Sequence, residues 1–545
     1  MYRQKRSYEN TTVKHSISGN SDNIYRDTKA GQEENMKKFD YSLVKDPQYF
    51  CDGRMEAHSD HMYYRSEEER EDEETSYRHS LNGLWKFHYA RNYASTVAGF
   101  EEDSYSCKDW EDIYVPAHIQ MEGYDAPQYA NVQYPWEGHE ELHPGQIPER
   151  FNPVGSYVKY FHVPENMKGK RVFISFQGAE SGLALWLNGT FVGYSEDSFT
   201  PSEFELTEYL KEGENKLAAQ VFKWTASSWC EDQDFFRFSG IYRDVYLYTV
   251  PEVHVYDLQI RSIPDETLKK ASLEIVTKTW GKVKMKLTLS RKGEILLQDE
   301  KALDGEDTCT WEILNPLLWS AEEPNLYDLD MEVYDENGML QEIIPEKVGF
   351  RRFEMKDGIM TLNGKRIVFK GVNRHEFSSV TGRHVSREEL IQDIVTMKQN
   401  NINAIRTCHY PDASPIYRLC DEYGLYMIAE NNLESHGSWD VAELTGDYTD
   451  IVPHNKPEWL GMMLDRVNSM YQRDKNHPAI LIWSCGNESF GGKDIFEMSE
   501  FYRKNDPTRL VHYEGLFHDR SYNATSDMES QMYPSVEAIK DFLAK

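Results

Sequence analysis

The first half of the chain alternates short apolar runs with turn residues. Between residues 80 and 250, the runs RVFISF at 171–176, ALWL at 184–187 and KLAAQVF at 216–222 have the length and composition of β-strands. Asn188-Gly189, between two such runs, is typical of a tight hairpin turn. We therefore predict an all-β sandwich of jelly-roll type over residues 39–250.

A second strand-rich segment begins at Pro251 and extends to Phe353. Within it, the run VKMKLTL at 283–289 alternates strictly between apolar and polar residues, as a strand does when one face is buried and the other is wet. A segment of about 100 residues suits a small immunoglobulin-like sandwich. We predict this fold over residues 251–353.

After Glu354 strand-like runs alternate with helical ones. A capping box formed by Ser386 and Glu389 predicts the start of the first helix. Repeated strand–helix units with buried apolar strands favour a parallel α/β fold over 354–545, either a barrel or a doubly wound sheet. The predicted helices are 386–400, 415–424 and 457–473, and the predicted strands are 367–372, 403–407, 425–429, 479–483, 510–513 and 527–533.

Composition narrows the classes of function. The 545 residues hold 60 Lys and Arg against 92 Asp and Glu, a formal charge of −32, which argues against nucleic-acid binding and against docking on an anionic membrane. A neutral sugar would be indifferent to this charge. Residues 1–38 are polar and without periodicity, so we predict a disordered tail there. Seven scattered cysteines without a C-x-x-C pair, and an N-terminus without a signal-peptide core, predict a cytoplasmic protein with reduced thiols.

Titratable side chains follow the predicted strands of the third segment. Such groups follow each strand at 373–376, 406–410, 430–436, 486–489, 513–514 and 533. In a (β/α)₈ barrel, catalytic groups lie at these C-terminal strand ends. Taken alone, His375 and His409 could equally be core residues whose hydrogen bonds are satisfied within the protein. The spacing of Glu434 and His436 is only weak evidence for a metal site.

Glu488 is the most informative of these residues. It follows the apolar run ILIW at 480–483, so burial should raise the pKa of its carboxyl group. A carboxyl group that stays protonated near neutral pH is suited to act as a general acid. Asn487 beside it can donate a hydrogen bond to a sugar hydroxyl.

Several motifs together resemble glycoside hydrolase family 2, specifically its long β-galactosidases of the lactose-cleaving type. The resemblance extends from about Ser80 to Tyr533. It rests on YDAPQYANVQYP at 124–135, GYSEDSFTPSEF at 193–204, EDQDFFRFSGIYRD at 231–244, LWSAEEPNLY at 318–327, GVNRHE at 371–376 and the Asn487-Glu488 pair.

This resemblance implies a jelly-roll domain, an immunoglobulin-like domain and a (β/α)₈ barrel in series. It implies hydrolysis of terminal β-D-galactosides with retention of configuration, by an enzyme that is often a homo-oligomer. Carried over by position, the implied roles are Glu488 as acid/base; Glu434, His436 and Glu488 as Mg²⁺ ligands; Asp234 as a contact of Na⁺ and sugar; Asn131 in the galactose pocket; His375 and His409 near the galactose hydroxyls; and Tyr533 in breakdown of the intermediate.

The chain also departs from the family pattern. Residues 377–379 are Phe-Ser-Ser, where lactose-type members usually have two histidines and a proline. The family nucleophile, a Glu after barrel strand seven within a recognisable motif, is absent. A retaining glycosidase needs two carboxylates about 5–5.5 Å apart. We therefore expect the N-terminal part of a β-galactosidase, with its barrel truncated after about strand six and the isolated chain inactive or nearly so.

Two alternatives stay open at this stage. The first is a non-catalytic carbohydrate-binding protein that uses the jelly roll as its binding module. The second is a family member with another specificity, a β-glucuronidase or a β-mannosidase. The motifs around Asn131 and Asp234 favour galactose because they belong to the lactose type.

Overall fold

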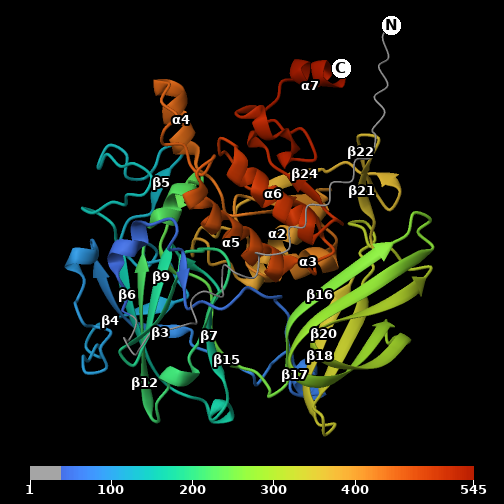
Figure 1. The fold of residues 1–545 in the computed structure, drawn as a ribbon, viewed down its shortest axis with the longest axis horizontal. Coiled ribbons are helices and arrows are strands. Elements are labelled where there is room, and N and C mark those ends of the chain that lie inside the picture. The colour runs from blue at the N-terminus through green and yellow to red at the C-terminus, as the bar shows by residue number, and fades with distance from the viewer. Residues whose placement is uncertain (1–37, 545) are drawn as a thin grey trace, which may run out of the picture. The chain divides into compact units, whose positions relative to one another are not determined.

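The computed structural model describes residues 38–544, drawn in colour in Figure 1. The tail predicted over 1–38 lies outside the described residues except for its last position. Across the described part of the chain, none of the helices combines the length and the apolar character that crossing a bilayer requires.

The first region is an antiparallel two-sheet sandwich, as the strand pattern predicted. Seven strands run in the order β1-β10-β9-β12-β6-β3-β4, and four run in the order β11-β7-β15-β2. Alternate residues of both sheets meet in one core, for example Trp85 and Leu217 from the first sheet with Ile174 and Leu247 from the second. The strands are β1 Cys51–Asp52, β2 Arg78–Ser80, β3 Gly83–Ala90, β4 Glu111–Val115, β6 Val154–His162, β7 Val172–Phe176, β9 Gly182–Leu187, β10 Thr190–Ser195, β11 Ser202–Glu205, β12 Glu214–Phe222 and β15 Val245–Thr249.

Two short ladders adjoin this sandwich. β5 (Gln128–Ala130) pairs with β13 (Phe235–Arg237), and β8 (Ala179–Glu180) pairs with β14 (Gly240–Ile241). The first ladder lies between the motifs at 124–135 and 231–244 and holds them side by side. A short helix, α1 (Glu67–Glu71), precedes β2.

The second region is built around two long strands. β17 (Lys270–Arg291) pairs with β16 (His254–Pro264) along its first half and with β19 (Tyr327–Tyr334) along its second half. An irregularity between Lys278 and Lys282 separates the halves, as expected where one bent strand serves two faces of a sandwich. β18 (Glu294–Leu314) and β20 (Leu340–Val348) complete it, and the apolar residues of 283–289 are buried as the alternation predicted.

A small antiparallel sheet precedes the α/β region and corrects one prediction. It consists of β21 (Phe353–Lys356), β22 (Ile359–Leu362) and β23 (Lys365–Arg366). The Ile367 backbone N–H then donates to the Met360 carbonyl at 3.0 Å. Because this pairing occupies the start of the predicted strand 367–372, the parallel strand there forms only over Gly371–Arg374 (β24).

The third region contains a parallel sheet with the strand order β24-β25-β26-β27-β28. Its other strands are β25 Ala404–Thr407, β26 Tyr426–Glu430, β27 Ile480–Ser484 and β28 Leu510–His512. All three predicted helices form, and the Ser386–Glu389 capping box is present at the first of them. The helices are α2 Arg387–Gln399, α3 Pro415–Tyr423, α4 His436–Thr445, α5 Pro457–Asp474, α6 Lys493–Asn505 and α7 Val536–Leu543. In Figure 1, α2, α3, α5 and α6 lie together, whereas α4 and α7 project at the top.

The strand predicted at 527–533 is wrong. The only backbone hydrogen bond from this segment to β28 is donated by the Asp527 N–H to the Val511 carbonyl, at 2.8 Å. The other contacts involve side chains: the Asp527 carboxylate accepts from the Val511 N–H at 2.7 Å, and Ser530 Oγ lies 3.1 Å from His512 Nε2. Met528 is the one residue of this segment that packs against the core. The described residues therefore form five parallel strands, not six, and their C-terminal ends share one edge of the sheet.

Candidate functional site

Side chains that follow the five parallel strands converge at this edge. Glu434 and His436 follow β26, Asn487 and Glu488 follow β27, and Glu514 follows β28. Parallel strands bring such residues together because every strand ends on the same side of the sheet. His375 and His409 follow β24 and β25 at the same edge.

Glu434, His436 and Glu488 form what we call the carboxylate cluster. One potential ligand atom from each lies within 4.8 Å of the other two. The His436 Nδ1 and Glu488 Oε2 atoms are 2.8 Å apart, and the Asn487 amide donates to Glu434 Oε2 at 3.1 Å. Stacking of His436 on Trp439, with ring centroids 4.4 Å apart, fixes the imidazole plane. The structure thus brings together the three residues implied as metal ligands.

The two carboxyl groups of this cluster differ in their electrostatics. Burial and the nearby Glu488 charge raise the pKa of Glu434 well above its usual value. Its Oε1 atom is buried and has no hydrogen-bond partner. Burial also disfavours the charged form of Glu488, but the hydrogen bond and charge of His436 outweigh it and lower the pKa of Glu488. The raised pKa predicted for Glu488 is therefore wrong, because a partner 52 residues away in the sequence opposes burial.

His409 is oriented by a buried carboxylate. Its Nδ1 atom lies 2.6 Å from Glu430 Oε1, while Arg406 Nε donates to Glu430 Oε2 at 2.6 Å. Burial alone would raise the pKa of Glu430, but the charge of Arg406 and the hydrogen bond to His409 hold that pKa at about 2. Glu430 is thus ionised and can only accept, so Nδ1 of His409 carries the hydrogen and Nε2 keeps its lone pair.

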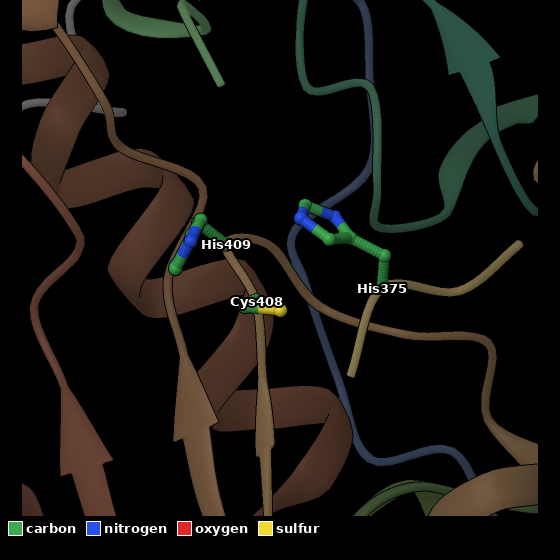
Figure 2. A group of neighbouring side chains, drawn as sticks. All are labelled: His375, Cys408 and His409. Atoms are coloured by element: carbon green, nitrogen blue, oxygen red, sulfur yellow. The ribbon is translucent and has the colours of Figure 1, made fainter. Parts of the chain in front are cut away.

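His375 faces the same space from β24 (Figure 2). Its ring stacks on Phe235, with centroids 4.5 Å apart, and its Nδ1 atom lies 3.2 Å from the Tyr410 hydroxyl. Burial, with the charges of His409 and Arg383, lowers the pKa of His375 to about 3. Burial likewise lowers the pKa of His409. Both imidazoles are therefore neutral near pH 7 and can act as hydrogen-bond acceptors.

A loop of the first region, residues 230–234, reaches this edge. The Glu434 N–H donates to the Cys230 carbonyl at 3.0 Å, and the Asp232 N–H donates to the Glu434 carbonyl at 3.0 Å. Asp234 lies between Gln233, which donates to Asn432 at 3.1 Å, and Phe235, which stacks on His375. Asp234 therefore lies between two residues that contact the strand-end loops, and it accepts a hydrogen bond from the Tyr129 hydroxyl.

Asn131 is brought close to Asp234 by the short ladder. Phe235 pairs with Ala130 in an antiparallel register, so Asp234 and Asn131 are the next two residues on the same side of that pair. Asn131 is exposed, as a group that contacts a ligand can be. The two residues implied to contact sugar thus meet although 103 positions separate them in the sequence.

Tyr533 is not brought to the site. Its side chain is 93% exposed, and it follows residues 526–532, which form no helix or strand. Its backbone adopts a left-handed conformation with φ 47°. In this structure Tyr533 is therefore a surface residue.

Sequence reasoning assigned no role to three residues that organise the site. Glu514 is 3% exposed, and its Oε1 accepts the Glu488 N–H at 3.0 Å. Arg406 donates to both Glu430 and Asn487 and so links two strand ends. Both follow the strand-end pattern and could have been found from it. Trp439, whose indole N–H donates to the Glu488 carbonyl at 2.8 Å, left no such signal because its helix was not predicted.

The chain matches three domains of one enzyme family. Residues 78–251 match the sugar-binding domain of the glycosyl hydrolases family 2, residues 253–351 match a second domain of that family, and residues 353–545 match its TIM barrel domain. These matches follow the order of the three regions described above.

Curated relatives are similar along nearly the whole chain. The β-galactosidase of Halalkalibacterium halodurans is 52% identical over 518 residues, which cover 92% of this chain and 50% of that protein. The β-galactosidase of Streptococcus thermophilus is 49% identical, with 93% of this chain and 50% of that protein covered. The chain spans about half the length of these two relatives. It covers 82% of the β-galactosidase large subunit of Leuconostoc lactis, at 43% identity and over 92% of its own length.

Solved structures have the same fold. A β-glucuronidase from Bacteroides uniformis has a TM-score of 0.68 at 22% identity, with 86% of this chain and 57% of that one covered. A β-glycosidase from Bacteroides vulgatus has a TM-score of 0.62 at 26% identity, with 80% of this chain and 53% of that chain covered. The domain matches, the long relatives and these folds lead to one conclusion: the chain belongs to glycoside hydrolase family 2.

Proposed function

We propose that this chain supplies the galactoside-binding groups and the acid/base carboxyl group of a retaining β-galactosidase. The observation that carries the proposal is the carboxylate cluster, in which Glu488 is held by His436 and by the Glu514 carboxylate at a strand end. Asp234 and His375 lie around the same space. The names of the relatives at 43–52% identity favour galactose over other sugars.

We further propose that the nucleophilic carboxylate comes from polypeptide outside these residues. Two buried carboxylates near Glu488 already bind groups of this chain, since Glu430 holds Arg406 and His409, and one oxygen of Glu514 holds the Glu488 backbone. Both β24 and β28 have a neighbour on only one side among the described residues, which leaves two sheet edges for further strands. A separate partner subunit is one source, as the large-subunit names of several relatives suggest.

The carboxylate cluster suits a divalent cation such as Mg²⁺. Two carboxylates and one imidazole provide few protein ligands, as Mg²⁺ prefers, and Glu434 Oε1 is a buried oxygen without a partner. Glu434, His436 and Glu488 would hold the ion, which would supply positive charge beside the acid/base carboxyl group. We also propose that Asp234 binds Na⁺, as the family resemblance implies. The chain's own groups would act on the sugar: His375 and His409 as neutral acceptors, Asn131 and Asn487 as donors.

Cation binding is testable on the isolated chain. We expect Mn²⁺, measured by titration calorimetry as a probe for Mg²⁺, to bind less tightly by more than about tenfold in Glu434→Gln, because changes to groups that merely orient metal ligands already cost about 10–100-fold. Glu443→Gln on α4, an exposed carboxylate 3.2 Å from His518, is the matched control. Equal Mn²⁺ affinity in the wild type and Glu434→Gln would exclude this site.

Turnover tests the proposed function itself. We expect the isolated chain to hydrolyse nitrophenyl β-galactoside negligibly, and a fusion to the C-terminal half of the Halalkalibacterium relative to hydrolyse it at a rate near that of the relative. The corresponding glucuronide and mannoside should remain poor substrates of the fusion. Full turnover by the isolated chain, or a preference for either other sugar, would contradict the proposal.

A further inference from the structure

A second group of potential metal ligands lies beside the carboxylate cluster. His375 follows β24, and Cys408 and His409 follow β25; one ligand atom from each lies within 4.8 Å of the other two (Figure 2). Cys408 is 1% exposed. This group contains one sulfur and two nitrogens and no carboxylate, so its chemistry differs from that of the carboxylate cluster.

We propose that His375, Cys408 and His409 bind a borderline-soft divalent cation, of which Zn²⁺ is the best match. Thiolate and imidazole are preferred ligands of Zn²⁺, whereas Mg²⁺ takes oxygen ligands. Three protein ligands leave a fourth tetrahedral position open. Two sites that select different ions would then share one edge of the sheet.

The surroundings of His409 prepare it for this role. Its Nδ1 atom lies 2.6 Å from Glu430 Oε1, which leaves Nε2 as the ring nitrogen that can bind an ion. A carboxylate that orients a histidine through the other ring nitrogen is the usual arrangement behind zinc ligands. A neutral His375 keeps a lone pair on one ring nitrogen whichever tautomer it adopts.

Closing the site requires only a small movement. Ligand atoms around tetrahedral Zn²⁺ are about 3.3–3.6 Å apart, so atoms separated by up to 4.8 Å must approach by roughly 1 Å. His375 is the ligand best able to move, because its hydrogen bond to Tyr410 is long at 3.2 Å and its side chain is only partly buried. When the ion binds, the Cys408 S–H bond breaks, the sulfur keeps the electron pair and binds the metal, and the proton passes to solvent.

Occupancy would have a consequence for the neighbouring chemistry. The ion would use lone pairs of the two imidazoles that we propose to face the sugar, so Zn²⁺ and galactoside are expected to exclude each other. This corollary rests on the proposed function, whereas ion binding itself does not.

The test uses Co²⁺ as a spectroscopic probe on the full chain. We expect a near-ultraviolet thiolate-to-cobalt charge-transfer band together with intense visible bands typical of tetrahedral Co²⁺, both abolished by adding Zn²⁺. Cys408→Ser should lose the charge-transfer band. Cys485→Ser, which removes another fully buried thiol after β27, should keep it. Circular dichroism establishes that each variant is folded.

Two more variants separate this site from the carboxylate cluster. Glu434→Gln should retain the thiolate band, because Co²⁺ bound at the carboxylate cluster cannot produce it. Glu430→Gln should weaken Co²⁺ binding about 10–100-fold through the loss of the group that orients His409. The absence of a thiolate band in the wild type, or its persistence in Cys408→Ser, overturns the proposal regardless of whether the chain acts on galactosides.

Discussion

Replacing Arg466 with Met is expected to destabilise the chain by about 3–5 kcal/mol, since it removes one partner of a buried ion pair and leaves the other charge uncompensated. Arg466, on α5, is 1% exposed and donates to Glu231 Oε1 at 2.8 Å. It also donates to the Asn432 carbonyl at 2.8 Å, so it joins the first region to the strand-end loop after β26. Urea unfolding followed by fluorescence would measure the change in the free energy of unfolding.

A matched control and the pH dependence sharpen this prediction. Arg503→Met breaks exposed pairs with Glu500 and Asp527 and should cost less than about 1 kcal/mol. Burial raises the pKa of Glu231 and Arg466 lowers it, so without Arg466 that pKa rises further. The folded variant then binds a proton at a pH where the unfolded chain has released it. The loss of unfolding free energy relative to the wild type should therefore shrink as the pH falls toward the pKa of Glu231 in the unfolded chain. A loss in Arg466→Met no larger than that in Arg503→Met would refute the argument.

Replacing Glu488 with Gln in the fusion is expected to lower kcat/KM for lactose by about 10²–10⁴-fold, the usual contribution of a general acid–base group. Gln has nearly the same shape as Glu, but its amide cannot deliver a proton to the leaving oxygen. The loss should be much smaller for a dinitrophenyl galactoside, because that leaving group departs without protonation. Steady-state kinetics on both substrates measures the difference.

The contrast between the substrates is what distinguishes acid/base chemistry from loss of structure. Glu500→Gln, an exposed carboxylate on α6, should leave both rates unchanged. An equal loss on both substrates in Glu488→Gln would assign Glu488 to holding the cation or the fold instead of to proton transfer.

Much of the fold could be predicted because its signals are local. The Ser386–Glu389 pair marked the start of α2, and apolar spacing located α5, because capping and helical periodicity depend on residues three or four positions apart. The strand at 527–533 failed for the converse reason. A strand exists only where a neighbour pairs with it, and there only Asp527 makes a backbone hydrogen bond to β28.

The candidate site was likewise predictable only in part. That the strand-end residues would gather at one edge could be predicted from the strand–helix repeat, since parallel strands share a polarity. The charge state of Glu488 could not be predicted, since it depends on His436 from another loop. The contact of residues 230–234 with Glu434 could not be predicted either, because it is made by backbone hydrogen bonds between two regions of the chain.

The sequence by itself therefore determined the three regions, the family resemblance and the residues able to carry the chemistry, because periodicity and motifs are properties of neighbouring positions. Only the tertiary structure decided which of these residues meet, and with what charge. It brought the neighbours of Asp234 to the strand ends, left Tyr533 at the surface, and placed Cys408 beside two histidines. The reason is physical: burial and electrostatic coupling depend on distances in space, which sequence separation does not measure.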